Sequence, residues 1–482
     1  MAKKYKLFIN GKWVNSSSGN TDRIINPSDE SLVGTVQIAT VTDANKALKA
    51  ADKAQKSWRR LPAIERANHL RAFTAGIRKN SERLAKLITK EQGKLLKVAR
   101  FEVEVTCSFI EYACGWARQI EGDILQSDNP SEQIWIHKVP KGVVVAITAW
   151  NFPLALAGRK LGPALITGNT LVLKPTPESP LSTLELCDIA KKSGMPDGVI
   201  NMITGGVEAG RALVENPITK MVTMTGGTPT GQAIARSAAQ NLTHVQLELG
   251  GKGPCIIFDD ADIDQAVAGA LHSRFDNNGQ VCTCNERMYI QEGIYDAFMK
   301  KFMKKVKALK LGDPNLEDTD IGPKMNEQGV VHLEKLVKES VDAGAKILCG
   351  GKRPKGKAFE KGFWFEPTIL GSVTQDMNVV HEEAFGPVLP VLKFKTFNEV
   401  IRYANDSQYG LAAIIFTNDM NNIMRLHEEL EFGETYINRG HGEQHQGFHN
   451  GLKLSGTGGE DGKYGLEQYL DKKTTYIRYK SK

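Results

Sequence analysis

Residues 142–149 read Gly-Val-Val-Val-Ala-Ile-Thr-Ala, and they open the stretch of sequence that decides the fold. Four more apolar runs follow at 170–174, 199–203, 219–224 and 243–248, with helical patterns between them. Alternation of β-branched runs with helices predicts a βαβ series of parallel strands. All five carboxyl ends should then lie along one edge of the sheet, where doubly wound folds bind their ligands.

The residues after these five strands are polar, glycine or aromatic. At any one strand end an ordinary turn is the simpler explanation, whereas five such ends together favour a binding edge. They are Trp150 and Asn151, Lys174, Gly205 and Gly206, Thr225 to Gly227, and Glu248 to Gly251.

The sequence on the amino-terminal side of this stretch predicts a hairpin and helices. In residues 1–25, Asn10 and Gly11 separate two short apolar runs and favour a tight hairpin turn. From Thr42 to Ile120 apolar residues recur at helical spacing, which predicts several amphipathic packing helices.

The sequence after Lys252 predicts a second α/β unit. Its apolar runs lie at 255–258, 287–291, 388–394, 411–417 and 434–438. The tail, residues 472–479, has strand propensity but follows the last expected element. Because an unpaired strand edge usually finds a partner, we interpret it as an oligomerisation strand.

Composition excludes several classes of protein. The chain has 482 residues, with 62 basic and 55 acidic residues interleaved along it and a formal charge of +7. No basic block indicates nucleic-acid binding. The longest apolar stretch, 143–157, is shorter than the ~18 residues of a membrane span, and the amino terminus does not resemble a signal peptide.

The cysteine pattern bears on compartment and metal binding. Seven cysteines scattered through a long chain are poor material for disulfides and favour a reducing cytoplasm. Cys282 and Cys284 have no second Cys or His pair nearby in sequence, so no metal site is expected. Cys282 follows Asn277-Asn278-Gly279-Gln280-Val281. A lone cysteine is usually an inert buried residue, so its interpretation depends on context.

The context is a set of motifs that resembles the aldehyde dehydrogenase superfamily, in that family's order and over essentially the whole chain. The motifs are Trp-Asn-Phe-Pro (150–153), Leu-Lys-Pro (173–175), Glu-Leu-Gly-Gly-Lys (248–252), Gly-Gln-Val-Cys (279–282) and Glu-Glu-Ala-Phe-Gly-Pro (382–387).

The resemblance implies an α/β fold with a Rossmann-like parallel-sheet cofactor domain, a second α/β catalytic domain and a small β extension for oligomerisation. The expected dinucleotide-binding domain comprises 1–125 and 144–247, and the catalytic domain 248–465. The expected oligomerisation strands are 126–143 and 466–482, in a homodimer or homotetramer.

The resemblance also implies three catalytic residues. Cys282 is the expected nucleophile that attacks an aldehyde, and Asn151 is the expected donor to the resulting oxyanion. Glu248 is the expected base for thioester hydrolysis, and its position after an apolar strand should raise its pKa.

The implied cofactor is NAD, with NADP possible. Ala149 replaces a usual proline, and Pro177 stands where NAD-preferring relatives often have a glutamate. A superficial P-loop at 205–210 is rejected because Arg211-Ala212 replaces its Lys-Ser/Thr. The expected cofactor residues are Trp150, Lys174, Glu178, Gly206, Gly210, Thr225, Gly226, Gly227, Leu249, Glu383 and Phe385.

The segments 432–439 and 446–449 look most similar to the lactaldehyde and glycolaldehyde dehydrogenase branch. By that resemblance Arg159, Thr283, Glu443 and His449 line the pocket of a small aldehyde substrate. A semialdehyde such as succinate semialdehyde remains an alternative. A CoA-acylating enzyme is disfavoured because Glu248 is retained, and a non-catalytic scaffold because the residue set is intact.

Overall fold

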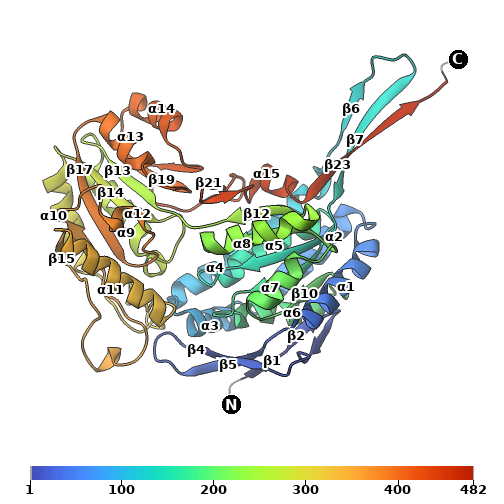
Figure 1. The fold of residues 1–482 in the computed structure, drawn as a ribbon, viewed down its shortest axis with the longest axis horizontal. Coiled ribbons are helices and arrows are strands. Elements are labelled where there is room, and N and C mark those ends of the chain that lie inside the picture. Colours follow the sequence, from blue (N-terminus) through green and yellow to red (C-terminus); the bar gives the residue numbers. More distant parts are fainter. Residues whose placement is uncertain (1–2, 481–482) are drawn as a thin grey trace.

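The five strands expected between residues 142 and 248 form the centre of an eight-stranded sheet in the computed structural model, which describes residues 3–480 (Figure 1). They run parallel in the order β12-β11-β8-β9-β10, which confirms the predicted βαβ series. Their bounds are β8 Val143–Thr148, β9 Thr170–Pro175, β10 Ile200–Met202, β11 Thr219–Thr225 and β12 His244–Glu248.

The strand order reverses beside β8. The chain passes from β8 through β9 to β10 on one side, and then places β11 and β12 on the other side. The carboxyl ends of β8 and β11 therefore frame a topological switch point, which is where open α/β sheets bind ligands. Trp150 and Asn151 follow β8, and Thr225 ends β11.

Helices cover both faces of this sheet, which explains why β9 is buried at every position. The connecting helices are α5 (Pro153–Ile166), α6 (Leu181–Lys192), α7 (Val207–Val214) and α8 (Thr228–Ala238). The helices expected between 42 and 120 are α1 (Val41–Trp58), α2 (Ala63–Lys79), α3 (Ser81–Gln92) and α4 (Leu96–Gly115).

The amino-terminal hairpin extends the sheet beyond β10. Strands β2 (Leu7–Ile9) and β3 (Lys12–Val14) are joined by Asn10 and Gly11, both with positive φ as a tight hairpin turn requires. At the opposite edge β22 (Gly456–Thr457) pairs with β12. Strands β1 (Lys3–Tyr5), β4 (Thr21–Ile25) and β5 (Leu32–Gln37) form a separate small sheet.

The second half of the chain builds a seven-stranded sheet from the described residues, in the order β15-β16-β17-β14-β13-β19-β20. The five expected strands appear as β13 (Gly253–Ile257), β14 (Asn285–Gln291), β17 (Val388–Phe394), β19 (Ala412–Phe416) and β20 (Glu434–Ile437), and they are parallel. Two strands that the sequence did not predict complete the sheet: β16 (Thr368–Gly371) pairs parallel with β17, and β15 (Lys346–Cys349) pairs antiparallel with β16 at the edge.

Helices α9 to α14 pack around this second sheet (Figure 1). They are α9 (Ile263–Phe275), α10 (Tyr295–Val306), α11 (Glu327–Asp342), α12 (Asn378–His381), α13 (Phe397–Asn405) and α14 (Met420–Glu429). Short elements β18 (Tyr409–Gly410), β21 (Leu452–Lys453) and α15 (Gly462–Glu467) lie in the connections.

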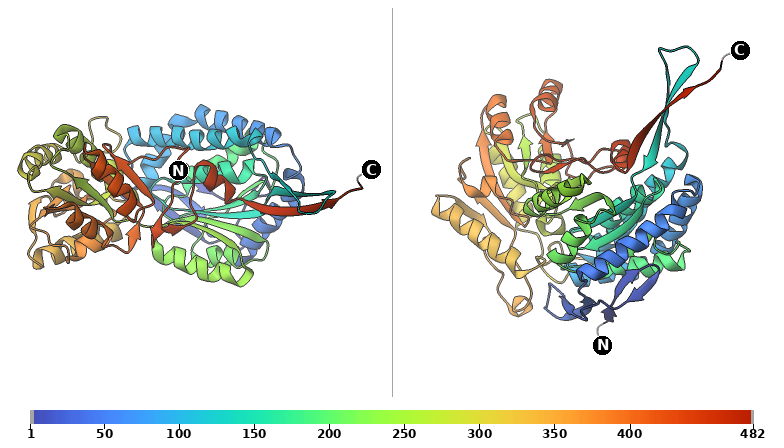
Figure 2. Two further views of the ribbon diagram at one scale, coloured as in Figure 1. Left: turned by 90° about the horizontal axis from the view of Figure 1, so that it is seen from above. Right: turned by 45° about the vertical axis from the view of Figure 1, so that its right-hand side comes forward.

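A β arm projects from the body of the molecule (Figures 1 and 2). It consists of β6 (Asp123–Gln126), β7 (Glu132–Pro140) and β23 (Leu470–Arg478). The expected terminal strand thus pairs along one edge with β7 of its own chain. The predicted domain limits remain predictions, and residues 1–2 and 481–482 lie outside the described range. No described helix has the length and apolarity that crossing a membrane requires.

Candidate active site

The three candidate catalytic residues come from three separate elements. Asn151 lies between β8 and α5, and Glu248 ends β12. Cys282 follows the short 3₁₀ turn η3 (Asp276–Gly279), which extends from α9 of the second unit. The candidate site therefore lies where the carboxyl edge of the first sheet meets the second unit.

An unusual backbone turn positions Cys282. Asn277, Asn278 and Gly279 all have positive φ, which is rare outside glycine and asparagine. A side chain at Gly279 would place its Cβ 2.4 Å from the carbonyl oxygen of Gly386. Gly251 is similarly constrained, because a Cβ there would lie 2.6 Å from the carbonyl oxygen of Cys282. Both glycines permit close packing around the candidate nucleophile.

Asn151 is held against the same turn. The side-chain Nδ2 of Asn151 donates to the backbone carbonyl oxygen of Gln280 at 3.1 Å. The backbone carbonyl oxygen of Asn151 accepts from Nδ2 of Asn277, also at 3.1 Å. The side chain is buried. One amide N–H is thus used to fix the direction of the group, and the other remains for an oxygen developing negative charge.

We expect Asn151→Ala to lower kcat by ~10²–10³-fold, because a preoriented donor to the oxyanion is lost. Steady-state rates of reduced nicotinamide formation measure this effect. The control is Asn241→Ala, since the Asn241 amide also donates to a backbone carbonyl but lies on the surface. Equal rates for the two variants would contradict the role assigned to Asn151.

Glu248 has the burial expected of a tuned base. It is 3% exposed, and burial raises its pKa to about 8. Neither carboxylate oxygen has a hydrogen-bond partner among residues 3–480. A buried and unsatisfied carboxylate is costly, so these oxygens are suited to accept from a substrate or a water molecule.

His449 lies between Glu248 and Cys282 and contacts both. Its Nε2 lies 3.5 Å from a carboxylate oxygen of Glu248, and its Nδ1 lies 3.0 Å from Glu434. Burial alone would lower its pKa, but the carboxylates of Glu434 and Glu248 raise the pKa well above its usual value. Burial raises the pKa of the Cys282 thiol, and a hydrogen bond to His449 offsets part of this effect.

Arg159 and Glu443, both expected in the pocket, form an ion pair in which Arg159 is buried and Glu443 is half-buried. Arg159 also lies 2.9 Å from Asp461, and its guanidinium stacks over Phe109 at 4.5 Å. Burial disfavours the ionisation of Glu443. The positive charge of Arg159 nevertheless holds the pKa of Glu443 well below its usual range. Thr283 is buried next to Cys282 in the chain.

The sequence interpretation missed a second ion pair beside this one. Lys160 contacts Glu460, and its Nζ also donates to Thr225 at 2.8 Å and to Thr223 at 3.1 Å. Glu434 and Asp461 were missed as well. A sequence signal for these partners was available. Arg159 and Lys160 lie side by side in an otherwise apolar helix, and charges buried in such a helix require partners of opposite charge.

The residues expected to bind the adenosine part of a dinucleotide lie together at the carboxyl edge. Burial lowers the pKa of Lys174 to about 8, and the carboxylate of Glu178 offsets part of this effect. Gly206 caps α7, and Gly210 faces the Lys174 side chain, whose Cε lies 3.5 Å from where a Cβ would be. A Cβ on Gly206 would meet nothing within 4 Å, so the backbone there is open to a ligand.

The residues expected nearer the nicotinamide also converge. Glu383 accepts from the backbone N–H of Gly251 at 2.7 Å, and burial raises its pKa to about 7. Trp150 and Phe385 form an edge-to-face pair with centroids 5.3 Å apart.

The remaining cofactor candidates lie around the amino terminus of α8. Gly227 caps this helix without a side-chain hydrogen bond, Gly226 bonds to the carbonyl of Glu248, and Leu249 bonds to Ser455. A helix amino terminus suits a pyrophosphate, although in α8 Pro229 has no N–H and the N–H of Thr230 donates to the carbonyl of Gly227. The residue set therefore fits a dinucleotide, although the Thr225 hydroxyl already accepts from Lys160.

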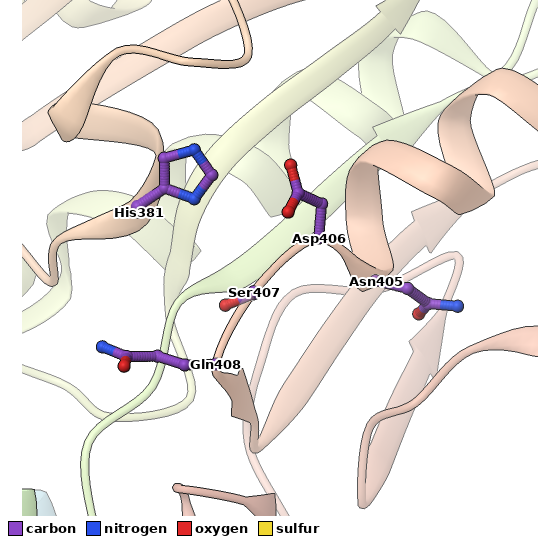
Figure 3. Close-up of a pocket in the computed structure, with 5 residues that line it drawn as sticks. All are labelled: His381, Asn405, Asp406, Ser407 and Gln408. Atoms are coloured by element: carbon purple, nitrogen blue, oxygen red, sulfur yellow. The ribbon is translucent and has the colours of Figure 1, made fainter.

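One cavity lies away from this constellation. It has a volume of about 450 Å³ and is lined by His381, Asn405, Asp406, Ser407 and Gln408, at the ends of α12 and α13 (Figure 3). A much smaller cavity of about 20 Å³ borders Arg159 and is lined also by Phe109, Tyr112 and Asp461. Arg159, which borders this small cavity, also forms ion pairs with Asp461 and Glu443.

Comparison with known proteins shows the family of this chain. A family model described as the aldehyde dehydrogenase family matches residues 13–475. The chain belongs to the aldehyde dehydrogenase family. It is thus an oxidoreductase acting on aldehydes, and its mixed α/β fold is that of solved aldehyde dehydrogenases.

Three relatives illustrate where this aldehyde dehydrogenase lies in the family. It is 59% identical to 3,6-anhydro-alpha-L-galactose dehydrogenase of Vibrio sp. (strain EJY3), covering 99% of this chain and 100% of the relative. It is 43% identical to lactaldehyde dehydrogenase of Escherichia coli (strain K12), and the match covers 98% of this chain and 99% of that relative. A solved structure of 3,6-anhydro-L-galactose dehydrogenase in complex with NAP is similar to this chain with a TM-score of 0.97 and 61% identity. The match covers 98% of this chain and 100% of the solved chain.

Proposed function

We propose that this aldehyde dehydrogenase oxidises a small hydroxylated aldehyde to its carboxylate, with NAD(P) as the hydride acceptor. The aldehyde of 3,6-anhydro-L-galactose is the first candidate, because a relative named for that sugar is 59% identical over the whole chain. Lactaldehyde and glycolaldehyde are the next candidates, supported by a 43% identical lactaldehyde dehydrogenase.

The observation that carries this proposal is the internal charge balance of the pocket. Arg159 is already paired with two carboxylates, those of Glu443 and Asp461. An anionic substrate tail would need an uncompensated cation, whereas a hydroxyl can both donate to a carboxylate and accept from a guanidinium. The pocket therefore favours hydroxyaldehydes over semialdehydes such as succinate semialdehyde.

The residues support a covalent route with balanced steps. Cys282 first loses its proton to water, and the thiolate then bonds to the aldehyde carbon while the C=O π electrons move to oxygen, where the Asn151 amide stabilises the oxyanion. The bound nicotinamide supplies the acceptor for the hydride, which leaves a thioester on Cys282. Glu248 then takes a proton from water, whose oxygen displaces the thiol and releases the carboxylate.

Two further assignments belong to the proposal. The exposed carboxylate of the neighbouring Glu178 supports NAD as the preferred cofactor, and NADP is an alternative because Pro177 stands where NAD-preferring relatives often have a glutamate. Tighter NADP than NAD binding by calorimetry would reverse that preference. CoA acylation is disfavoured because the open carboxylate of Glu248 suits activation of water.

We also propose a cytoplasmic homodimer or homotetramer assembled through the β arm. Apolar residues of the arm are exposed in the single chain, with Ile124 at 74% and Tyr476 at 67%. Exposed apolar residues on a projecting strand mark a surface that another chain can cover. The cysteines are free in the described structure, in keeping with a reducing compartment.

A substrate panel tests the proposal. Rates are measured with 3,6-anhydro-L-galactose, lactaldehyde, glycolaldehyde, succinate semialdehyde and propanal, each with NAD and NADP. We expect a hydroxylated aldehyde to give the highest kcat/KM. A higher value for succinate semialdehyde or propanal would refute the substrate class while leaving the family unaffected.

Glu443→Gln provides a sharper test of the pocket. We expect kcat/KM for the preferred hydroxyaldehyde to fall by ~10–100-fold, the cost of a charge-assisted hydrogen bond, and propanal to be affected less. Because the variant leaves Arg159 less neutralised, the relative rate with succinate semialdehyde should rise. Glu429→Gln, which alters an exposed ion pair with Arg425, is the control.

A further inference from the structure

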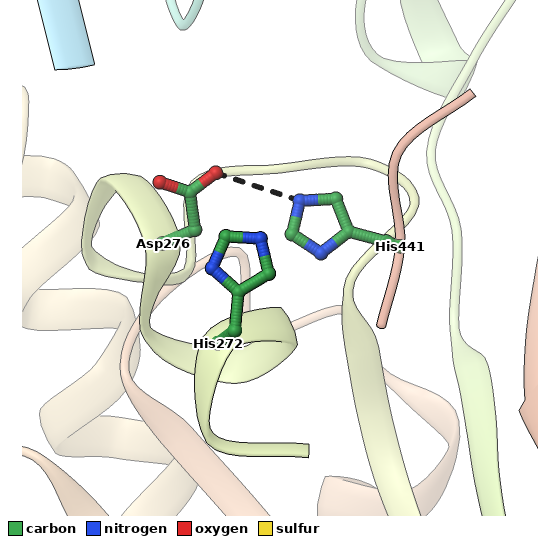
Figure 4. Close-up of side chains that lie close together, drawn as sticks. All are labelled: His272, Asp276 and His441. Atoms are coloured by element: carbon green, nitrogen blue, oxygen red, sulfur yellow. Dashed lines mark ion pairs between the residues drawn. The ribbon is translucent and has the colours of Figure 1, made fainter. Parts of the chain in front are cut away.

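Three potential metal ligands lie close together, and one of them begins the turn η3 that precedes Cys282 (Figure 4). His272 lies in the last turn of α9, and Asp276 follows four residues later as the C-cap residue of the same helix. His441 comes from the loop after β20. One ligand atom from each residue lies within 4.8 Å of the others.

The spacing of the ligand atoms resembles a coordination site more than a hydrogen bond. The Nε2 of His441 lies 3.5 Å from the carboxylate oxygen of Asp276. A charge-assisted hydrogen bond is shorter, at about 2.7–2.9 Å. Two ligands of a tetrahedral zinc ion with bonds near 2.0–2.1 Å are separated by roughly 3.4 Å, which is close to the spacing observed here.

A neighbouring hydroxyl can orient His441 for a metal. Oγ of Ser273 lies 3.1 Å from Nδ1 of His441, and Nε2 faces Asp276. When Nδ1 donates to this hydroxyl, Nε2 carries the free lone pair that a metal needs. The rings of His272 and His441 are stacked, with centroids 5.1 Å apart and planes at 8°.

We propose that His272, Asp276 and His441 bind a divalent transition-metal ion of the zinc type. Two imidazoles and one carboxylate are the donor set that zinc and its neighbours prefer over calcium or magnesium. His272 is exposed, so the ion has an entry path and a water molecule completes its coordination. No sequence motif announces this site because His441 is 169 residues from His272.

The ion would link two segments of the candidate active site. Asp276 begins η3, the turn that positions Cys282. His441 lies two residues before Glu443, which pairs with Arg159 in the pocket. A bound ion therefore ties the pocket loop to the nucleophile turn and restrains the motion of residues 439–445.

The test uses the full chain with Cys282→Ala, because the Cys282 thiol could also bind zinc. After treatment with a chelator, Zn²⁺ is titrated by calorimetry and Co²⁺ by its visible absorption. We expect one site per chain, slower hydrogen exchange at 439–445 and a higher Tm with the ion. In this background, His272→Gln, Asp276→Asn and His441→Phe should each weaken binding by ~100-fold or more, and Ser273→Ala by ~10-fold.

The exposed His427→Gln on α14 is the matched control and should leave binding unchanged. His272→Gln alters an exposed side chain, so its folding is secure and its result can be interpreted even if a variant of a more buried ligand unfolds. Absence of binding in the parent chain overturns the proposal. Binding that persists unchanged in His272→Gln and Asp276→Asn assigns the ion to another location and overturns it equally. Because these readouts do not use turnover, they are independent of the proposed substrate.

Discussion

Cys282→Ala is expected to lower kcat by roughly 10⁶-fold, the scale of loss when a catalytic nucleophile is removed. Without the sulfur no covalent intermediate can form, and the oxyanion donor alone cannot replace it. The variant should still bind the nicotinamide cofactor, because the expected cofactor residues lie at the sheet edge and include neither Cys282 nor its loop. Turnover is followed by the absorbance of reduced nicotinamide, and cofactor binding by calorimetry.

The other cysteines offer a control for this result. Burial raises the pKa of Cys284 to about 12, so its thiol is inert near neutral pH. Cys349 is half-buried and lies on β15, far along the sheet from the candidate site. Cys349→Ala should retain activity, and iodoacetamide should inactivate the enzyme by alkylating Cys282. Turnover by Cys282→Ala comparable to that of Cys349→Ala would remove the basis of the proposed chemistry.

The part of the fold that local patterns specify was predictable from the sequence. The buried strands β8 to β12 follow from β-branched runs, and the hairpin follows from Asn10 and Gly11. The edge strands β15 and β16 were not predicted, although each pairs in the second sheet. Residues 346–349 are mostly exposed, so their strand state depends on pairing with β16 rather than on an apolar run.

In the candidate site, too, residues in local motifs were predictable and contacts made by tertiary packing were not. Cys282, Asn151 and Glu248 could be proposed because each lies in a recognisable motif near a strand end or a tight turn. The partner of Lys160 could not be, because Glu460 is 300 residues away and only tertiary packing brings the two together. His449 itself was expected in the pocket from the resemblance, but its contact with Glu434 and the cluster around His441 depend on tertiary packing in the same way.

The burial of Glu248 leads to the second large prediction. In Glu248→Gln we expect kcat to fall by ~10²–10⁴-fold, because the general base for hydrolysis is lost. Formation of the thioester should survive, since it depends on Cys282 and Asn151. Rapid mixing should therefore show a burst of about one reduced nicotinamide per active site, followed by slow turnover. Mass spectrometry should detect the acyl group on Cys282.

The pH dependence separates the two steps further. A base must be deprotonated to act, and the pKa of Glu248 is raised to about 8, so steady-state turnover limited by hydrolysis should increase as the pH rises through about 8. This dependence should disappear in Glu248→Gln, while the burst rate continues to follow ionisation of Cys282. The exposed Glu360→Gln, which should behave as the unmodified enzyme, is the control. If Glu248→Gln showed no burst and no trapped thioester, the carboxylate would be needed before hydrolysis, and its role would be activation of the thiol instead.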